Sequence, residues 1–153
     1  MIDKLKDIRQ IATSQELNKL KHFKAKEFVC SCCGLVQMDA AIGPKLDKLR
    51  DLVGRALIIT SGYRCPEHNA KIGGAAGSYH VRGMAVDVSI KGFTSQDIYK
   101  LVAGAISLQF RGLELGHPKG MQVIHLDIRE EPGIIIFYPI DKTDKIKEIK
   151  EKG

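Results

Sequence analysis

The sequence predicts an α+β fold in which helices flank a mainly antiparallel central sheet. Three strand-like segments follow one another late in the chain, at 111–116, 122–128 and 133–138, with only short turns between them. Helical patterns occur elsewhere, but they do not alternate regularly with strands as the helices of a parallel sheet do. A chain of 153 residues has the length of one ordinary domain. We therefore expect one α+β domain built around a single core.

The first part of the chain has weak patterns. Residues 1–20 are expected to form a peripheral segment, with loosely helical spacing of the apolar side chains Ile2, Leu5, Ile8, Ile11 and Leu17. Residues 22–38 predict a short extended segment and a turn, in which Gly34 is the flexible point. The domain itself is expected to cover residues 21–140, and a polar tail residues 141–153.

The pattern becomes clear from residue 39 onward. Asp39 predicts a helix cap. Apolar side chains then recur at steps of three and four residues, at Ile42, Leu46, Leu49 and Val53. Gly54 follows the last of them and predicts the end of this helix. Residues 56–61 are apolar and β-branched, which predicts a buried strand.

A short helix, a strand and a longer helix are predicted next. Residues 66–72 have room for one or two helical turns, and residues 85–90 alternate as a strand does. Thr94 and Asp97 have the spacing of a capping box. The helix that they begin is expected to bury one face, which consists of Leu101, Val102, Ala105 and Ile106.

The charge and the apolar content exclude some classes of function. The formal net charge is +6, but the basic residues are scattered and are not interleaved with aromatic ones, so we expect no nucleic-acid partner. No apolar run approaches the roughly 20 residues that span a bilayer, so we expect no membrane span. The N-terminus is charged and lacks the apolar centre of a secretory signal, which predicts synthesis in the cytoplasm without a signal peptide.

Four cysteines occur, at Cys30, Cys32, Cys33 and Cys65. Without a secretion signal they are expected to be thiols rather than disulfides. A zinc ribbon brings paired Cys-x-x-Cys knuckles, whereas three of these cysteines crowd into VCSCCG, so the spacing fits a zinc ribbon poorly. We expect the thiols to fill a compact turn as small apolar side chains, with metal binding as the alternative.

Two stretches, residues 61–87 and 122–129, combine the side chains that zinc prefers. His80 and Asp87 come from the first, and His125 from the second. In QVIHLDIR the two-residue period of a strand puts His125 and Asp127 on one face, opposite an apolar face. Three nitrogen and oxygen ligands leave a fourth zinc position open, as in catalytic sites. From these residues alone, metal binding and ordinary hydrogen-bonded histidines are both open.

The motifs SGYRCPEHN, GSYHVRGMAVD and IHLDIR resemble the zinc D-Ala-D-Ala carboxypeptidase and murein endopeptidase family (LAS-type metallopeptidases, peptidase family M15). Its small phage or prophage members share the preamble HFKAKEFVCSCCG, and the resemblance covers roughly residues 21–138. It implies a fold like that of hedgehog domains and D-Ala-D-Ala peptidases, with one zinc ion as the cofactor.

Position by position, the resemblance implies that His80, Asp87 and His125 bind zinc. It implies that Arg64 is catalytic and substrate-binding, because a guanidinium holds either a developing oxyanion or a terminal carboxylate. Ser78 is expected to shape the loop or to bind the substrate.

The general base departs from the family pattern. Many relatives have Glu three residues before the last zinc ligand or His two before it, and this chain has Gln122 and Val123 there. Asp127 is the first candidate, either as the catalytic base or to orient a ligand, and Glu114 and His117 are alternatives.

The resemblance implies a zinc-dependent peptidase that hydrolyses peptidoglycan stem peptides, either D-Ala-D-Ala carboxypeptidase-like or an endolysin-type endopeptidase. Such a protein would act on the bacterial cell wall after release, as phage- or prophage-encoded enzymes do. The alternative is a zinc-holding, non-catalytic module of the same fold that binds the cell wall or a protein. The expected oligomeric state is a monomer.

Overall fold

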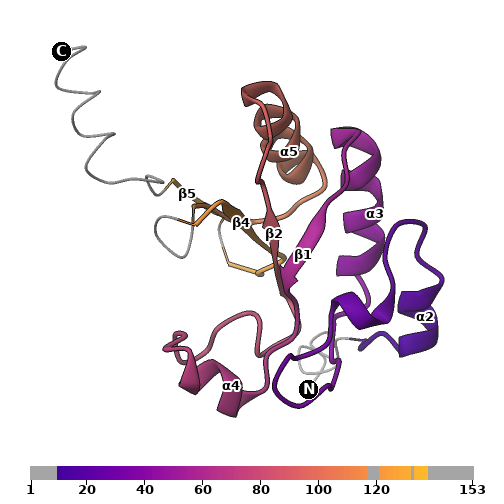
Figure 1. Cartoon of the computed structure of the whole chain (residues 1–153), viewed down its shortest axis with the longest axis vertical. Coiled ribbons are helices and arrows are strands. Elements are labelled where there is room, and N and C mark those ends of the chain that lie inside the picture. The colour runs from indigo at the N-terminus through magenta and orange to yellow at the C-terminus, as the bar shows by residue number, and fades with distance from the viewer. Residues whose placement is uncertain (1–9, 117–120, 132, 138–153) are drawn as a thin grey trace, which may run out of the picture.

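A single twisted sheet forms the centre of the molecule. The computed structural model describes residues 10–116, 121–131 and 133–137 (Figure 1). The strands lie in the order β1-β2-β4-β3-β5. They are β1 (Ile58–Ser61), β2 (Ala85–Ser89), β3 (Gly112–Leu115), β4 (Val123–Asp127) and β5 (Ile134–Phe137). Neighbouring strands are antiparallel except for β3 and β5, which are parallel. The predicted α+β fold with a mainly antiparallel sheet is confirmed.

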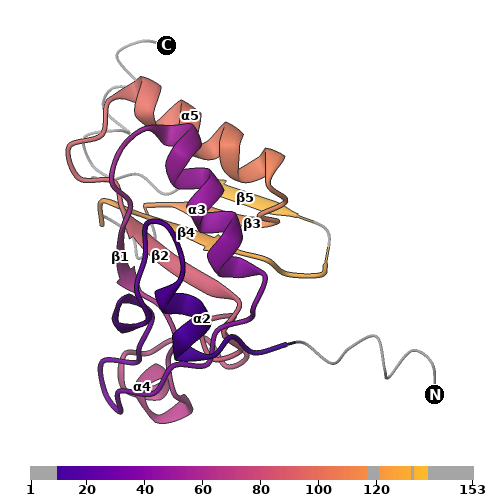
Figure 2. The same cartoon turned by 90° about the vertical axis from the view of Figure 1, so that its right-hand side faces the viewer.

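Helices α3 (Ile42–Val53) and α5 (Ser95–Ser107) lie side by side against one face of the sheet (Figure 2). The four apolar positions predicted for α3 are all buried: Ile42, Leu46, Leu49 and Val53. The two helices approach closely at Gly104, where an added Cβ would lie 3.0 Å from Leu49 Cδ1. The core therefore fills the space between this helix pair and the sheet.

The end of α3 and the start of α5 follow the predicted signals, but Asp39 is not the cap of α3: the N-cap is Ala41, which makes no side-chain cap hydrogen bond. Asp39 Oδ1 accepts a hydrogen bond from the N–H of Ala41 (2.9 Å), just before α3, and Gly54 ends that helix with φ of 72°. At the start of α5, Thr94 Oγ1 accepts from Asp97 N (3.1 Å) and Asp97 Oδ2 accepts from Thr94 N (2.9 Å). This reciprocal pair is the predicted capping box.

Two predictions of burial are wrong. Residues 56–61 were expected to form a buried strand, but β1 lies at the edge of the sheet and Ile58 is 62% exposed. An edge strand has a neighbour on one side only, so less of its surface is covered. Ile106 was expected in the core and is 50% exposed, because it lines an open hollow of about 450 Å³ beside Phe110 and Ile135.

The N-terminal part packs against the same core. It contains α2 (Ser14–Asn18) and η1 (Ala25–Glu27), a single 3-10 turn where the sequence predicted an extended segment. Leu17, Phe23 and Phe28 are buried, and Ile11 forms an isolated bridge with Asp39. The predicted segment boundaries near residues 20 and 140 stay predictions, since residues 1–9 and 138–153 lie outside the described part.

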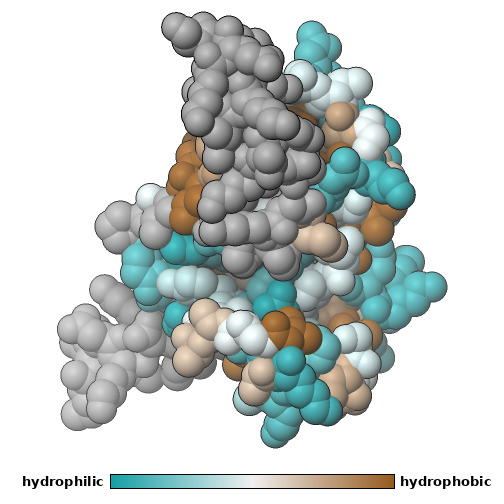
Figure 3. Space-filling model, turned by 60° about the vertical axis from the view of Figure 1, so that its left-hand side comes forward, coloured by the Kyte–Doolittle hydropathy of each residue, from teal (hydrophilic) through white to brown (hydrophobic). Residues whose placement is uncertain are grey.

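The site region lies between the sheet and α4 (Pro66–Lys71), a short helix at the opposite end of the molecule from α5 (Figure 1). On the face shown in Figure 3, described hydrophilic and hydrophobic residues are mixed, and the hydrophobic ones form separate groups. Within the described ranges, no helix combines the length and apolar character needed to cross a bilayer.

Candidate metal centre

Antiparallel pairing of β2 and β4 places Asp87 directly opposite His125. Side chains alternate across a strand, so both point away from α3 and α5, while their neighbours Val86 and Leu126 are buried in the core. Asp87 Oδ1 and His125 Nδ1 are 3.0 Å apart. The register of β2 and β4, which are distant in sequence, therefore brings two of the three candidate ligands together.

His80 joins this pair from the loop before β2. Its Nδ1 lies 2.8 Å from the carbonyl oxygen of Gly62, and its Nε2 lies 3.1 Å from Asp87 Oδ1. A carbonyl can only accept, so Nδ1 carries the proton and Nε2 has its lone pair on the side of Asp87. His80, Asp87 and His125 are all buried, and their ligand atoms lie within 4.8 Å of one another.

Backbone contacts hold the His80 loop in position. The N–H groups of Arg64 and Gly83 both donate to the His80 carbonyl (3.2 Å each), and the N–H of His80 donates to Ser78 Oγ (3.3 Å). Gly83 has φ of 70°, and an added Cβ would collide with the carbonyl oxygen of Gln37. Glycine is therefore the residue that this turn accepts.

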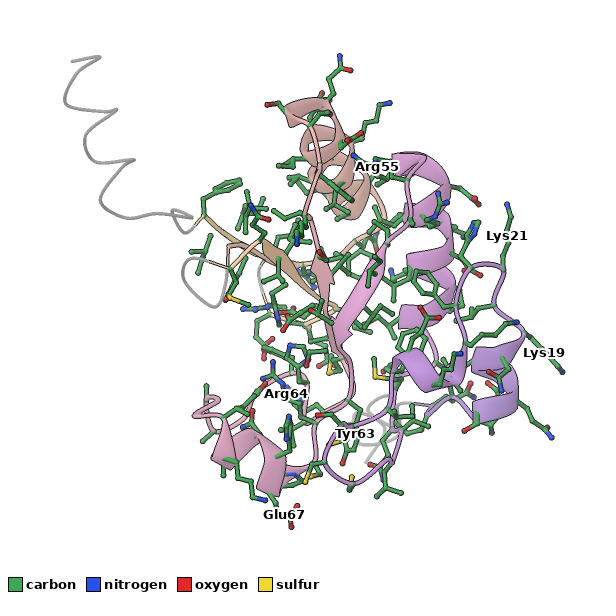
Figure 4. All side chains as sticks on the ribbon, viewed as in Figure 1. Lys19, Lys21, Arg55, Tyr63, Arg64 and Glu67 are labelled. Atoms are coloured by element: carbon green, nitrogen blue, oxygen red, sulfur yellow. The ribbon has the colours of Figure 1, made fainter. Side chains whose placement is uncertain are left out.

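Arg64 lies beside the cluster, with its guanidinium directed inward from the segment between β1 and α4 (Figure 4). Its Nη2 donates to Asp87 Oδ2 (3.2 Å) and its Nε to Ser61 Oγ (3.1 Å). Nη1 lies 3.5 Å from Asn69 Oδ1. These contacts orient a charged, planar donor group next to the three candidate ligands.

Asp127 lies behind His125 rather than beside the open side of the cluster. Its Oδ2 accepts from His125 Nε2 (2.8 Å), and Arg129 donates to both of its oxygens (2.6 and 2.8 Å). Its side chain is fully buried. The opposite residue is Gly112, where an added Cβ would collide with the Asp127 carboxylate. Asp127 therefore fixes the ring of His125 and directs Nδ1 toward Asp87.

The buried carboxylates of Asp127 and Asp87 stabilise positive charge on the neighbouring side chains. Burial raises the pKa of Asp127, but hydrogen bonds from Arg129 and His125 outweigh it and hold that pKa well below its usual range. Burial likewise opposes ionisation of Asp87, and its two histidine neighbours hold its pKa far below the ordinary value. Burial lowers the pKa of His125, yet Asp127 and Asp87 raise it to about 9.

This donor set fits a zinc ion. Two imidazoles and one carboxylate are zinc ligands, and three protein ligands are typical of catalytic rather than structural sites. The second nitrogen of each ring is already bonded, to the Gly62 carbonyl for His80 and to Asp127 for His125. Such outer hydrogen bonds set the tautomer and the orientation of metal-binding histidines.

The cluster opens into a cleft of about 400 Å³. The predicted residues Arg64, Ser78 and Glu114 line this cleft together with the three candidate ligands. Asp127 is not among the residues that line it, and His117 lies outside the described residues. The structure thus brings together site residues from four separate parts of the sequence.

Sequence reasoning missed the contribution of Arg129 and Tyr79, which also line the cleft. The Arg129 guanidinium carbon lies 4.7 Å from the centre of the Tyr79 ring, and the Tyr79 hydroxyl donates to Glu131 (2.6 Å). The signal for Arg129 was its place two residues after Asp127, on the same side of an extended chain. No comparable sequence signal pointed to Tyr79.

Comparison with known proteins adds one finding. The sequence model of a family described as Peptidase M15 matches residues 21–127. That range includes both strands and the loop that carry His80, Asp87 and His125. A comparison with curated proteins finds no match.

Proposed function

This chain belongs to the peptidase M15 family, and we propose that it is a zinc peptidase that hydrolyses peptide bonds in peptidoglycan stem peptides. The observation that carries the proposal is the buried cluster of His80, Asp87 and His125 at the cleft, with Arg64 beside it. Membership of the family confirms the resemblance seen in the sequence motifs.

His80 through Nε2, His125 through Nδ1 and the carboxylate of Asp87 would hold the zinc ion. When bound, zinc acts as a Lewis acid that activates water near neutral pH and stabilises negative charge on the substrate. The His80–Gly62 and His125–Asp127 hydrogen bonds keep the ligand nitrogens directed at one point. Ordered ligands of this kind lower the cost of binding the ion.

Arg64 supplies the charged donor for the substrate. Its contacts with Ser61 and Asp87 hold the guanidinium in place before the substrate arrives, so little reorganisation accompanies the reaction. It would bind the carbonyl oxygen that becomes negative, or the terminal carboxylate of a short peptide. Ser78 holds the His80 loop through its oxygen and would donate its hydroxyl hydrogen to the substrate.

We assign proton transfer to Glu114 rather than to Asp127. Asp127 is fully buried and both of its oxygens accept hydrogen bonds, which suits the orientation of His125. Glu114 lies opposite His125 on β3 and lines the cleft, where a carboxylate can take a proton from water and pass it to the leaving amine.

The bond that is cleaved distinguishes two versions of the proposal. A carboxypeptidase would use Arg64 to bind the terminal carboxylate of D-Ala-D-Ala, whereas an endopeptidase would bind a carbonyl within the peptide. We extend the proposal to a phage- or prophage-type enzyme that reaches the cell wall after release.

The second candidate function is a non-catalytic binding module. It is supported by Gln122, which is exposed, and Val123, which is buried, at the positions where many relatives have an acidic or imidazole residue.

The test is hydrolysis of defined stem peptides by the purified protein, with products identified by mass spectrometry. Cleavage that is lost with a chelator and restored by zinc is expected, and the product masses identify the bond. His80→Ala should lose the activity. A protein that binds zinc in a His80-dependent way but cleaves none of the peptides would overturn the peptidase in favour of the binding module.

A further inference from the structure

A second cluster of metal-ligating side chains lies outside the cleft. The sulfur atoms of Cys30, Cys33 and Cys65 all lie within 4.8 Å of one another. Cys30 and Cys65 are buried, and Cys33 is exposed. Figure 4 shows sulfur atoms near Tyr63, between α4 and the adjacent loop. The thiols therefore converge from two segments that are far apart in the sequence.

The segment with Cys30 and Cys33 is a closed turn. The N–H of Cys30 donates to the carbonyl of Leu35, and the N–H of Gly34 donates to the carbonyl of Cys30 (2.8 Å each). Gly34 has φ of 72°, a conformation that glycine adopts without strain. Cys-x-x-Cys on such a turn is the ligand spacing of structural zinc sites. The remaining cysteine of the crowded motif, Cys32, is exposed and lies outside the cluster.

The two buried sulfur atoms also accept backbone hydrogen bonds. The N–H of Cys65 is 3.4 Å from Cys30 Sγ, and the N–H of His68 is 3.4 Å from Cys65 Sγ. A neutral thiol is a weak acceptor, whereas N–H donors directed at sulfur stabilise a thiolate, the form that binds metal. These contacts are independent of the distances between the sulfur atoms and indicate the same kind of ligand.

We propose that Cys30, Cys33 and Cys65 hold a structural zinc ion and that the His68 ring, which lies outside the 4.8 Å cluster in this structure, turns toward the thiols as the fourth ligand. The spacing of Cys65 and His68 repeats that of Cys30 and Cys33, with two residues between the ligands. The His68 ring lies against the cysteine turn, because its Nε2 is 3.4 Å from Ser31 Oγ. Binding of Zn²⁺ releases the thiol protons to solvent. Three sulfur ligands and one nitrogen ligand make a closed tetrahedral site, unlike the open centre in the cleft.

The proposed zinc site lies next to the wall of the cleft. Gly62 and Tyr63, just before Cys65, contact Phe28, just before Cys30. The N–H of Tyr63 donates to the Phe28 carbonyl (2.9 Å), and Gly62 packs against the Phe28 backbone. The Gly62 carbonyl also accepts the His80 hydrogen bond, and Arg64 lies between Tyr63 and Cys65 in the sequence. A zinc ion at the thiols would therefore stiffen the wall of the cleft that carries Arg64.

The test compares the zinc content and the cobalt spectra of single variants of the full chain. Wild type is expected to bind two zinc ions per chain, and Cys33→Ser and His80→Ala one each. Cys32→Ser is the matched control and should keep both. With cobalt in place of zinc, the thiolate-to-metal charge-transfer band should be present in wild type, Cys32→Ser and His80→Ala, and absent in Cys33→Ser. His68→Ala should weaken this band or change its shape.

Cys33 is exposed, so its replacement is expected to leave the fold intact, which circular dichroism checks. Equal zinc content and an equal thiolate band in wild type and Cys33→Ser would overturn the proposal, as would a Cys30–Cys65 disulfide in the purified wild type. Neither result bears on the zinc peptidase itself, because the His80→Ala variant and the peptide assay test that site separately.

Discussion

Two clusters of candidate metal ligands adjoin the SGYR segment, and they are built differently. His80, Asp87 and His125 use nitrogen and oxygen, lie mainly on paired strands and open into a cleft with Arg64. The cysteine cluster uses sulfur and lies on a tight turn and the start of α4. In the proposed assignments, three nitrogen and oxygen ligands leave the reactive centre open, whereas four ligands, three of them sulfur, close the structural one.

The groups that surround the candidate ligands also differ between the two clusters. In the cleft cluster, side chains and a carbonyl orient the rings, and a guanidinium lies within reach of a substrate. In the cysteine cluster, backbone N–H groups point at the sulfur atoms.

The largest effect is expected for His125→Ala. Loss of a ligand and of its contacts with Asp87 and Asp127 should remove zinc from the cleft and reduce peptide hydrolysis to background. The thiolate band of the cobalt protein should be unchanged, since the cysteine cluster shares no residue with this site. Gln122→Ala, at an exposed position just before β4, is the control and should keep its activity.

Glu114→Gln separates metal binding from proton transfer. The amide keeps the size of the side chain but cannot accept a proton, so kcat should fall by about 10² to 10⁴-fold while the zinc content stays at the wild-type level. Steady-state kinetics with a stem peptide and metal analysis measure the two quantities. Unchanged kcat in this variant would return the role of base to Asp127.

Arg64→Lys keeps a positive charge but loses the planar fork that contacts Ser61 and Asp87. A fall in kcat/KM of about 10² to 10³-fold is expected, the size seen when one oxyanion donor is removed. Arg55→Lys is the matched control, because Arg55 pairs with Asp97 at the start of α5 rather than with the cleft. Equal kinetics in the two variants would contradict the substrate role of Arg64.

Asp127→Asn tests whether Asp127 acts through His125. The amide cannot hold both His125 and Arg129 as the carboxylate does, so zinc affinity should fall by about 10 to 100-fold. The measurement is competition with a chelator of known affinity. If Asp127 only orients the ring, saturating zinc should restore most of the activity, whereas a general base would not be rescued in this way.

The smallest effect is expected for Thr94→Ala, which removes the capping oxygen of α5. The loss in free energy of unfolding should be about 1 kcal/mol, measured by urea denaturation. Both metal contents should stay at the wild-type level, because α5 is remote from both clusters. Loss of metal in this variant would mean that general destabilisation empties the sites.

The stability contributed by Asp97, the second residue of the capping box, depends on pH. The Thr94 N–H, and then Arg55, lower the pKa of Asp97 from its ordinary value. The stability from this carboxylate is therefore present above the ordinary pKa and is lost as the pH falls through the lowered value of the folded state. Asp97→Asn should be less stable than wild type near neutral pH, and the difference should shrink in acid.

Much of the fold was predictable because local signals and burial agree. The α3 positions from Ile42 to Val53, the capping box at Thr94 and the late strands all have patterns that depend on a few neighbouring residues. The errors came where a distant partner decides exposure. Ile58 has a β-branched side chain suited to a core strand, but β1 lies at an edge, and no local pattern reveals which strand is last in a sheet.

The sequence by itself determined the residue types and the motifs: HVRGMAVD and HLDIR carry a ligand set that resembles one family, and the match to residues 21–127 supports that family. Only the tertiary structure decided which side chains share a point in space. Strand register put Asp87 opposite His125, hydrogen bonds hold Asp127 to Arg129, and packing of the cysteine turn against the start of α4 brought Cys33 close to Cys65. The physical reason is that ligand atoms must meet within a few ångströms, which depends on the packing of distant segments rather than on local sequence.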